Sequence, residues 1–197
     1  MPSFFTLPAY ALTFVVVLVI WATPDVFDSI TKHPRPGAAD VRDGHSHQFF
    51  RLGLSLGLIA AGLLAHFRPQ DTLPYHRPWL FTLGIVIVLA GFALRRWAIH
   101  TLGRFFTVDV ATFADQRVVD APPYRRIRHP AYSGSILSIL GTALMLGHPL
   151  GFVLVALAIL VTFTYRIRLE ERALVAALGA PYAAYMRRTK RLVPFVW

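Results

Sequence analysis

The sequence contains no cysteine, which excludes disulfide bonds, thiolate metal sites and a cysteine nucleophile. It is also poor in charge, because only 15% of its 197 residues are Asp, Glu, Lys or Arg, against about a quarter in a typical soluble domain. Acidic residues are the scarcest, with 10 Asp and Glu against 20 Lys and Arg. Together with 55% hydrophobic residues and a mean hydropathy of +0.53, these shortages indicate a membrane protein rather than a soluble enzyme.

Long stretches without a charge predict the membrane spans. They cover residues 4–23, 52–67, 78–94 and 132–165. The last stretch has 34 residues and would reach about 50 Å as one helix, well beyond a hydrocarbon core of about 30 Å. Gly147-His148-Pro149 offers a break, since proline cannot donate to the helix ladder, so we expect two short antiparallel helices over 132–146 and 150–165. The sequence therefore predicts an all-α integral membrane protein with five transmembrane helices, the last two forming a helical hairpin.

The basic residues predict the orientation of these spans. Eighteen of the 20 Lys and Arg fall in segments that alternate spans would place on one side of the membrane. The positive-inside rule then puts the N-terminus outside and the C-terminus in the cytoplasm. This topology explains the basic excess without nucleic acid as a partner, since anionic lipid headgroups lie nearby. The first stretch lacks a basic n-region, so we expect a membrane span there rather than a signal peptide.

Two polar segments at the predicted cytoplasmic face are candidates for chemistry, and the first is 116–134. Pro130 suits the first turn of a helix, where its missing N–H is no loss. His129 would then stand beside unpaired backbone N–H groups that favour anionic ligands, with Tyr132 within the first turn. Taken alone, the segment fits equally well a ligand site and a basic membrane anchor.

The second segment, 165–195, contains the only two glutamates of the chain, Glu170 and Glu171. Arg166 lies four residues before Glu170 and shares its helix face, and Arg168 is placed to meet Glu171 on a neighbouring face. An ordinary ion-paired helix end is one explanation. Ionisable groups at the membrane boundary of a bundle usually line a functional cavity, which favours a functional role.

Together these segments resemble the isoprenylcysteine carboxyl methyltransferase family, within the wider group of integral-membrane methyltransferases that includes phospholipid N-methyltransferases. Four ordered motifs surround the predicted hairpin. They are Tyr124 with the Arg-His-Pro-x-Tyr-x-Gly of 128–134, Arg-x-x-x-Glu-Glu at 166–171, Gly-x-x-Tyr-x-x-Tyr at 179–185, and Arg-Leu-x-Pro at 191–194. The resemblance covers about residue 102 to the C-terminus. It implies a single membrane-embedded domain over 1–197, with the first three spans in 1–100 and a methyltransferase core with a cytoplasmic helical cofactor-binding region in 101–197.

The resemblance also implies a cofactor, S-adenosyl-L-methionine, in a pocket that faces the cytoplasm. Carried over by position, the cofactor contacts are Gln116, Arg117, Val118, Val119, Tyr124, His129, Pro130, Ala131, Tyr132 and Glu170. Arg166 would bind the acceptor, and Arg166, Glu170 and Glu171 form the implied catalytic set. The family usually has His in place of Gln116, and often Gly-Pro-Tyr in place of Pro122-Pro123-Tyr124.

The implied reaction suits these residues, because a carboxylate acceptor is already ionised at neutral pH and needs no general base. Arg166 would hold that carboxylate in position for an in-line displacement. A phospholipid amine acceptor would instead need deprotonation, for which Glu170, Glu171 and His129 are candidate bases. This N-methyltransferase is the first alternative, and a non-catalytic small transporter or assembly protein is the second.

The expected partners are membrane lipids and a hydrophobic or prenylated small-molecule or protein acceptor, with oligomeric state open. The location would be the inner membrane of a prokaryote or the endoplasmic reticulum of a eukaryote. We expect no metal site: Asp43, His45 and His47 lie in a polar stretch that predicts a solvated loop, with no further ligands in view. His100 and Arg104 are expected at the cytoplasmic surface or the pocket wall rather than in a catalytic role.

Overall fold

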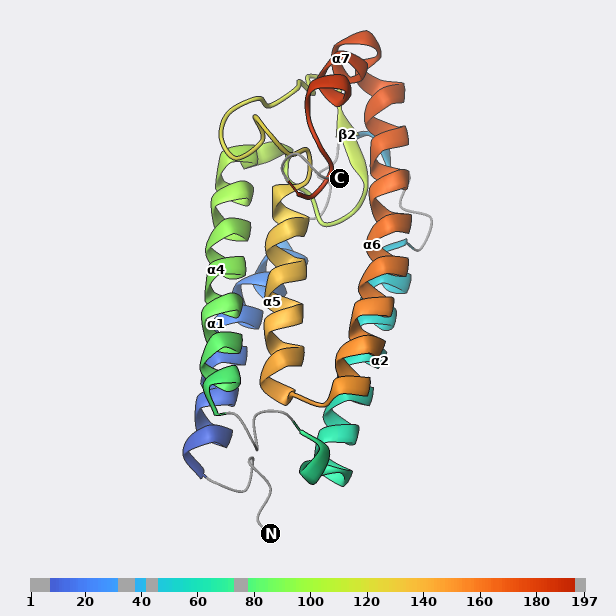
Figure 1. Cartoon of the computed structure of the whole chain (residues 1–197). Coiled ribbons are helices and arrows are strands. Elements are labelled where there is room, and N and C mark those ends of the chain that lie inside the picture. Colours follow the sequence, from blue (N-terminus) through green and yellow to red (C-terminus); the bar gives the residue numbers. More distant parts are fainter. Residues whose placement is uncertain (1–7, 32–37, 42–45, 73–77, 194–197) are drawn as a thin grey trace.

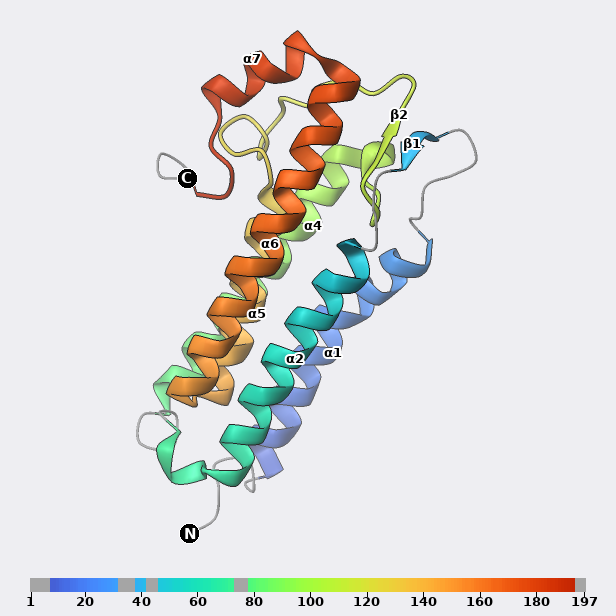
Figure 2. The same cartoon turned by 90° about the vertical axis from the view of Figure 1, so that its right-hand side faces the viewer.

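Five long helices run lengthwise beside one another in the computed structural model (Figure 1), which describes residues 8–31, 38–41, 46–72 and 78–193. They are α1 (Pro8–Thr31), α2 (Ser46–Phe67), α4 (Trp79–Leu102), α5 (Pro130–Leu146) and α6 (Pro149–Leu178). Single-turn helices η2 (Pro69–Asp71) and η3 (Gly103–Phe105) follow α2 and α4, and the short helix α7 (Ala180–Arg188) crosses one end. Helices α1 and α2 lie along one side of α4, α5 and α6 (Figure 2).

The helical membrane architecture predicted from the uncharged stretches is confirmed. The four segments long and apolar enough to cross a membrane are Pro8–Thr31, Ser46–Phe67, Trp79–Phe105 and Pro149–Leu178. Helix α5 is a shorter apolar helix of 17 residues, at the position predicted for the fourth span. Each predicted span thus coincides with a helix, whereas a fifth crossing of the membrane stays a prediction.

The break between α5 and α6 lies where Gly147-His148-Pro149 predicted it. Gly147 adopts the left-handed conformation (φ 69°) that glycine accepts without strain, and its N–H donates to the carbonyl of Ala143. The His148 side chain then accepts a hydrogen bond from the N–H of Gly151, and Pro149 opens the next helix. Local sequence alone is sufficient to form this hairpin.

Helix α6 is longer than expected. The predicted last span ended at residue 165, with the glutamates following it, but the helix continues without a break to Leu178 and ends at Gly179. No glycine or proline interrupts 152–178, so the helical hydrogen bonds continue through the charged residues. Arg166, Glu170 and Glu171 are therefore held on the same continuous helix as the last predicted span, which agrees with the helix faces predicted for them.

A short antiparallel ribbon is added to the helical architecture that the sequence predicted. Strand β1 (Ala38–Val41) pairs with β2 (Ala111–Phe113), and Ala38 lies opposite Phe113. Neither segment carries an alternating apolar pattern long enough to predict a strand. The ribbon joins the α1–α2 connection to the segment that follows α4, at the end of the bundle shared with α7 (Figure 2).

The closest helix contact is between α4 and α5, and small residues permit it. A Cβ atom on Gly134 would lie 2.5 Å from the carbonyl oxygen of Gly91, and one on Gly141 would lie 2.8 Å from that of Gly84. Ser138, between the two α5 glycines, donates to the carbonyl of Val88 at 3.1 Å. In lipid, where the hydrophobic effect supplies little attraction between helices, helix contacts typically form through small residues that allow close packing and hydroxyl residues that form hydrogen bonds.

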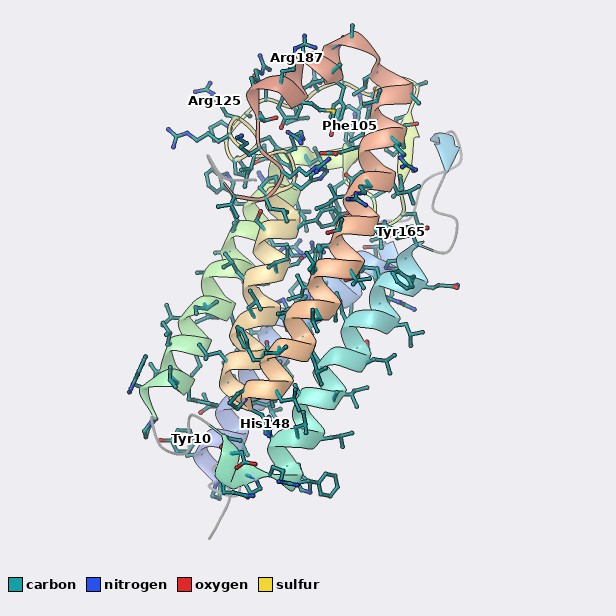
Figure 3. All side chains as sticks on the ribbon, turned by 45° about the vertical axis from the view of Figure 1, so that its right-hand side comes forward. Tyr10, Phe105, Arg125, His148, Tyr165 and Arg187 are labelled. Carbon is teal, nitrogen blue, oxygen red and sulfur yellow. The ribbon has the colours of Figure 1, made fainter. Side chains whose placement is uncertain are left out.

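The two ends of the bundle differ in character (Figure 3). Arg125 and Arg187 lie at the end that carries β2 and α7, and Tyr10 and His148 lie towards the opposite end. The described basic segments 103–129 and 179–193 meet at the first of these ends, which we call the basic end. Their gathering agrees with the alternation used to predict topology.

Candidate active site

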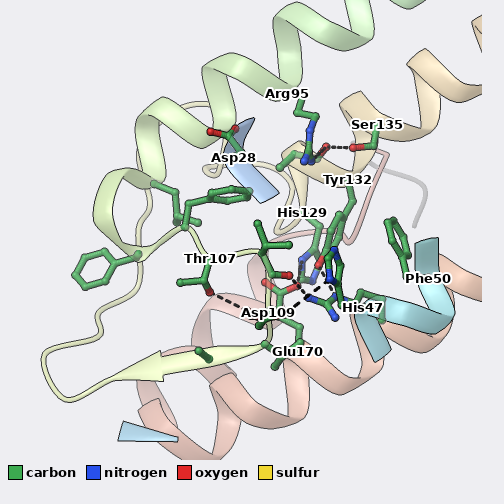
Figure 4. Close-up of a pocket in the computed structure, with 18 of the residues that line it drawn as sticks. Asp28, His47, Phe50, Arg95, Thr107, Asp109, His129, Tyr132, Ser135 and Glu170 are labelled. Carbon is green, nitrogen blue, oxygen red and sulfur yellow. Dashed lines mark hydrogen bonds and ion pairs between the residues drawn. The ribbon is translucent and has the colours of Figure 1, made fainter. Parts of the chain in front are cut away.

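A cavity of about 780 Å³ opens within the basic end of the bundle. Its walls come from α1, α2, α5 and α6 together with the segments 105–112 and 116–119 (Figure 4). The volume lies within the range of small-molecule and cofactor sites, about 300–1,000 Å³. Of the predicted cofactor residues, the cavity is lined by Gln116, Arg117, Val118, Val119, Tyr124, His129, Ala131, Tyr132 and Glu170, and it is also lined by Arg166.

The start of α5 forms one wall. Pro130 occupies the first helical position and is fully buried behind the cavity surface rather than lining it. The His129 ring is 4% exposed and stacks on the Tyr132 ring, with centroids 5.5 Å apart and an angle of 20° between the planes. Its Nδ1 lies 3.9 Å from a carboxylate oxygen of Glu170. One imidazole and one phenol therefore present a continuous aromatic surface to the cavity.

The segment before α5 forms a second wall. Gln116 Oε1 is buried and has no hydrogen-bond partner in the structure. Tyr124 donates through its hydroxyl to the carbonyl of Ala98 at 3.3 Å and accepts at its own carbonyl from the Tyr185 hydroxyl at 2.7 Å. Burial raises the pKa of Tyr124, so this phenol stays neutral and remains a donor. The peptide bond between Pro122 and Pro123 is cis.

Arg166 lies on the facing helix, α6, and is only 3% exposed. Its guanidinium donates to Ser46 Oγ at the start of α2 and to the carbonyl of Val108, and its Nε lies 3.4 Å from the Tyr132 hydroxyl. Glu170, one turn further along, is part-exposed at 31% and lies 3.9 Å from the His129 ring that stacks on Tyr132. Tyr132 thus stands between a buried cation and a carboxylate that is open to the cavity.

Glu171 does not line the cavity, although it adjoins Glu170 in sequence. Its carboxylate is 5% exposed and accepts from Arg128 Nε at 2.9 Å and from Arg191 Nη2 at 3.0 Å. The predicted pairing with Arg168 is wrong, because Arg168 points to the outside of α6 and the partners of Glu171 come from distant parts of the chain. A catalytic role for Glu171 stays a prediction.

His47 was expected in a solvated loop, and for this residue the expectation is wrong. It lies in the first turn of α2, lines the cavity, and places Nδ1 3.9 Å from Asp109 (Figure 4). Asp43 and His45 lie outside the described residues. Within the described ranges, no three His, Cys, Asp or Glu residues are grouped as metal ligands would be. His100 and Arg104 are exposed, and Arg104 pairs with Asp115.

Two ion pairs between α1 and α4 were missed by sequence reasoning. Arg95 Nε donates to Asp25 at 2.8 Å, and Arg96 Nη1 donates to the buried Asp28 at 2.6 Å. Asp25, Asp28 and Arg95 line the cavity. A general signal was present, since the two acids follow the first predicted span and the two arginines follow the third, and the predicted topology puts both positions on the same side of the membrane.

A family model for the isoprenylcysteine carboxyl methyltransferase (ICMT) family matches residues 83–176. A probable protein-S-isoprenylcysteine O-methyltransferase of rice (Oryza sativa subsp. indica) is 32% identical over 138 residues, which cover 68% of this chain and 72% of the rice protein. The chain belongs to the isoprenylcysteine carboxyl methyltransferase family. The resemblance drawn from the four motifs is confirmed.

Other ICMT relatives agree over shorter stretches. Protein-S-isoprenylcysteine O-methyltransferase B of Arabidopsis thaliana is 33% identical over 120 residues, or 60% of this chain and 61% of that protein. The Saccharomyces cerevisiae relative is 34% identical over 116 residues and is covered to 48%. A solved structure of a eukaryotic intramembrane Ras methyltransferase, ICMT, matches with a TM-score of 0.59 at 24% identity, over 75% of this chain and 52% of that one, which supports a shared fold.

Proposed function

We propose that this chain is an integral-membrane methyltransferase that uses S-adenosyl-L-methionine to methylate the carboxylate of a hydrophobic or prenylated acceptor. The observation that carries the proposal is the position of Arg166. This buried cation contacts Tyr132, and Tyr132 stacks on His129 in the predicted cofactor wall. A guanidinium held by fixed partners is suited to hold a carboxylate. The relatives are named as protein-S-isoprenylcysteine O-methyltransferases, which supports this reaction. This chain spans 61% of the length of the Arabidopsis relative B.

The cavity walls fit the proposed cofactor. Gln116 Oε1 is a buried acceptor without a partner, suited to a ligand ammonium or hydroxyl group. The Glu170 carboxylate adds a negative charge to the same cavity, and the stacked rings of His129 and Tyr132 offer an apolar face to a flat base. When bound, S-adenosylmethionine supplies a methyl group on a sulfonium: an O–CH₃ bond forms as the S–CH₃ bond breaks, and the sulfur keeps the electron pair.

The chain's own contribution to the reaction is positioning. Arg166 holds the acceptor carboxylate by charge-assisted hydrogen bonds, and its contacts to Ser46 and Val108 keep the guanidinium from moving. No proton needs to be transferred, because the carboxylate is ionised at neutral pH. The acceptor's apolar chain has a place between α1, α2 and α5, where Trp21, Leu54 and Ile139 line the cavity.

The membrane placement belongs to the same proposal. Helix α5 lies beside α4 along its length and is proposed as a fifth span, short enough to require local thinning of the bilayer. The basic end, which holds the cavity, faces the cytoplasm by the positive-inside rule. Residues 101–197 then form the methyltransferase core, while α1 and α2 complete the acceptor side of the cavity.

The test combines binding and product analysis. Purified protein is titrated by calorimetry with S-adenosylhomocysteine, as are the His129→Ala and Glu170→Gln variants, which we expect to bind more weakly. Labelled donor is then offered with a prenylated cysteine analogue or with phosphatidylethanolamine, and the product is treated with base. A base-labile ester from the first acceptor supports the proposal, and a base-stable product from the second establishes the N-methyltransferase alternative.

Arg166 has a matched control two residues further along the same helix. We expect Arg166→Gln to lower kcat/KM by about 30-fold or more, since loss of a buried charge-assisted contact costs about 2 kcal/mol or more, and to leave S-adenosylhomocysteine binding intact. Arg168→Gln removes an equal charge from the exposed side of α6 and is expected to change neither quantity. Equal activity of the two variants would exclude Arg166 as the acceptor residue, and absence of S-adenosylhomocysteine binding in all proteins would exclude the enzyme.

A further inference from the structure

The two adjacent glutamates have different surroundings, and the buried one, Glu171, has no contact with the cavity. We infer that Glu171 is a positioning residue, which fixes the His129 ring against the cavity and ties the segment 189–192 to the start of α5. The inference rests on the proposed function, because it assigns how the proposed cofactor wall is held in place. Three sets of contacts carry it.

The first set is made by the backbone. The segment 189–192 runs beside the segment 126–129, where Ile127 and Lys190 form a parallel β-bridge. The N–H of Arg128 donates to the carbonyl of Lys190 at 2.7 Å, and the N–H of His129 donates to that of Arg191 at 3.0 Å. The Ser133 hydroxyl donates to the carbonyl of Leu192 at 2.6 Å. The backbone at His129 is thus located by a segment 60 residues away, which needs an anchor of its own.

The second set supplies that anchor. Arg128 and Arg191 project from the two paired segments, and both donate to the Glu171 carboxylate, at 2.9 Å from Arg128 Nε and at 3.0 Å from Arg191 Nη2. Arg128 also donates to the carbonyls of Met186 and Thr189 at the end of α7. One carboxylate on the rigid helix α6 therefore joins both strands of the bridge. Without it, Arg128 and Arg191 would lose the carboxylate that they share.

The third set reaches the cavity. The Nε2 of His129 lies 3.4 Å from Oε1 of Glu171, whereas its Nδ1 lies 3.9 Å from Glu170. The nearer carboxylate is also the more buried, with 5% of its side chain exposed against 31%. Although Nε2 does not meet hydrogen-bond geometry, it is the ring nitrogen nearer to a carboxylate, and this close buried charge favours the ring orientation that turns Nε2 towards Glu171 and leaves Nδ1 on the side of Glu170. The His129 ring stacks on Tyr132, and Tyr132 contacts Arg166. The orientation of the His129 ring therefore affects both the proposed cofactor wall and the proposed acceptor residue Arg166.

A double-mutant cycle on S-adenosylhomocysteine affinity tests the inference. Calorimetry is performed on the wild type, Glu171→Gln, His129→Ala and the double variant, with melting temperatures measured in the same detergent. If Glu171 acts through His129, each single variant weakens binding by about tenfold, and the double variant binds no more weakly than His129→Ala. Asp71→Asn, which removes an exposed ion-paired carboxylate at the opposite end, is the charge control and is expected to bind as the wild type does.

Several outcomes would overturn the inference. If the loss of S-adenosylhomocysteine affinity in the double variant equals the product of the losses in the two single variants, Glu171 acts independently of His129. A lower melting temperature of Glu171→Gln with unchanged affinity would show a structural ion pair and nothing more. If Glu171→Gln does not fold, the cycle is run with Glu171→Asp, which keeps the charge but shortens the side chain. A wild type that does not bind S-adenosylhomocysteine would instead overturn the proposed function itself, together with this inference.

Discussion

Gly134, the last residue of the motif that opens α5, is the point at which α5 approaches α4 most closely. The substitution Gly134→Ala would place a Cβ atom 2.5 Å from the carbonyl oxygen of Gly91 and 2.6 Å from the backbone N of Arg95. Both neighbours are backbone atoms of a helix, so neither can rotate away as a side chain would. The two helices must therefore separate by roughly 1 Å at a contact that otherwise has no void.

The cost of this separation can be worked out approximately. Adding a methyl group to a close-packed contact typically costs about 1–3 kcal/mol, and the rigid neighbours place this case in the upper half of the range. For a chain of this size, 1 kcal/mol corresponds to about 2–4 °C in melting temperature. We expect Gly134→Ala to melt about 4–12 °C below the wild type in the same detergent micelle. Cofactor affinity should also fall, because Tyr132 lies two residues before the displaced glycine.

Gly62 in α2 provides a matched control. An added Cβ there has no neighbour within 4 Å, so Gly62→Ala makes the same change in helix propensity without the steric conflict. Thermal melting followed by circular dichroism should separate the two variants clearly. If Gly134→Ala melts within about 1 °C of Gly62→Ala, the close contact between α4 and α5 is not as the structure describes, and the argument from packing fails.

Two further predictions concern charge. We expect Asp28→Asn to lower the melting temperature by about 6–12 °C, since Asp28 is buried against the part-exposed Arg96 and removing one partner of such a pair costs about 3 kcal/mol. The exposed pair of Arg68 and Asp71 serves as the control, for which the loss should stay below about 1 kcal/mol. We also expect stability to fall as pH rises above about 10, because burial raises the pKa of Tyr124, Tyr182 and Tyr185 above the value of the unfolded chain. The stabilisation from these neutral phenols is complete below that pH, and Tyr185→Phe should make the decline in melting temperature between pH 9 and 11 shallower; an unchanged slope would contradict this assignment.

Much of the fold follows from local sequence. Uncharged stretches gave the positions of the helices, and Gly147-His148-Pro149 gave the hairpin, because turn and helix signals act between residues close in the chain. The extent of α6 was not predicted, because the uncharged stretch sets only the length of the predicted span, whereas the helix continues through the charged residues until Gly179. The ribbon of β1 and β2 was not predictable, because short strands are stabilised by pairing with a distant segment rather than by their own pattern.

The candidate site divides in the same way. Motif order and spacing identified the family. Of the ten cofactor residues that the motifs predicted, nine line the cavity. The sequence could not place His47 at the cavity, because its contact with Asp109 joins segments with no shared spacing along the chain. Charge placement offered only a general signal for the pairs of Arg95 and Arg96 with acids of α1, and the individual partners come from the structure. The family resemblance assigned Glu170 and not Glu171 to the cofactor, but the partners of Glu171 could not be predicted, because they lie far away in the chain.

By itself the sequence determined that this is a helical membrane protein with a methyltransferase-family motif set, because hydropathy, charge placement and motif spacing are properties of the linear chain. Only the tertiary structure decided that Glu171, next to the predicted cofactor residue Glu170, turns away from the cavity, and what it contacts there. Successive residues on a helix point about 100° apart, so one carboxylate reaches the cavity while the next turns towards Arg128 and Arg191. Those partners come from before α5 and after α7, and folding alone brings them together around Glu171.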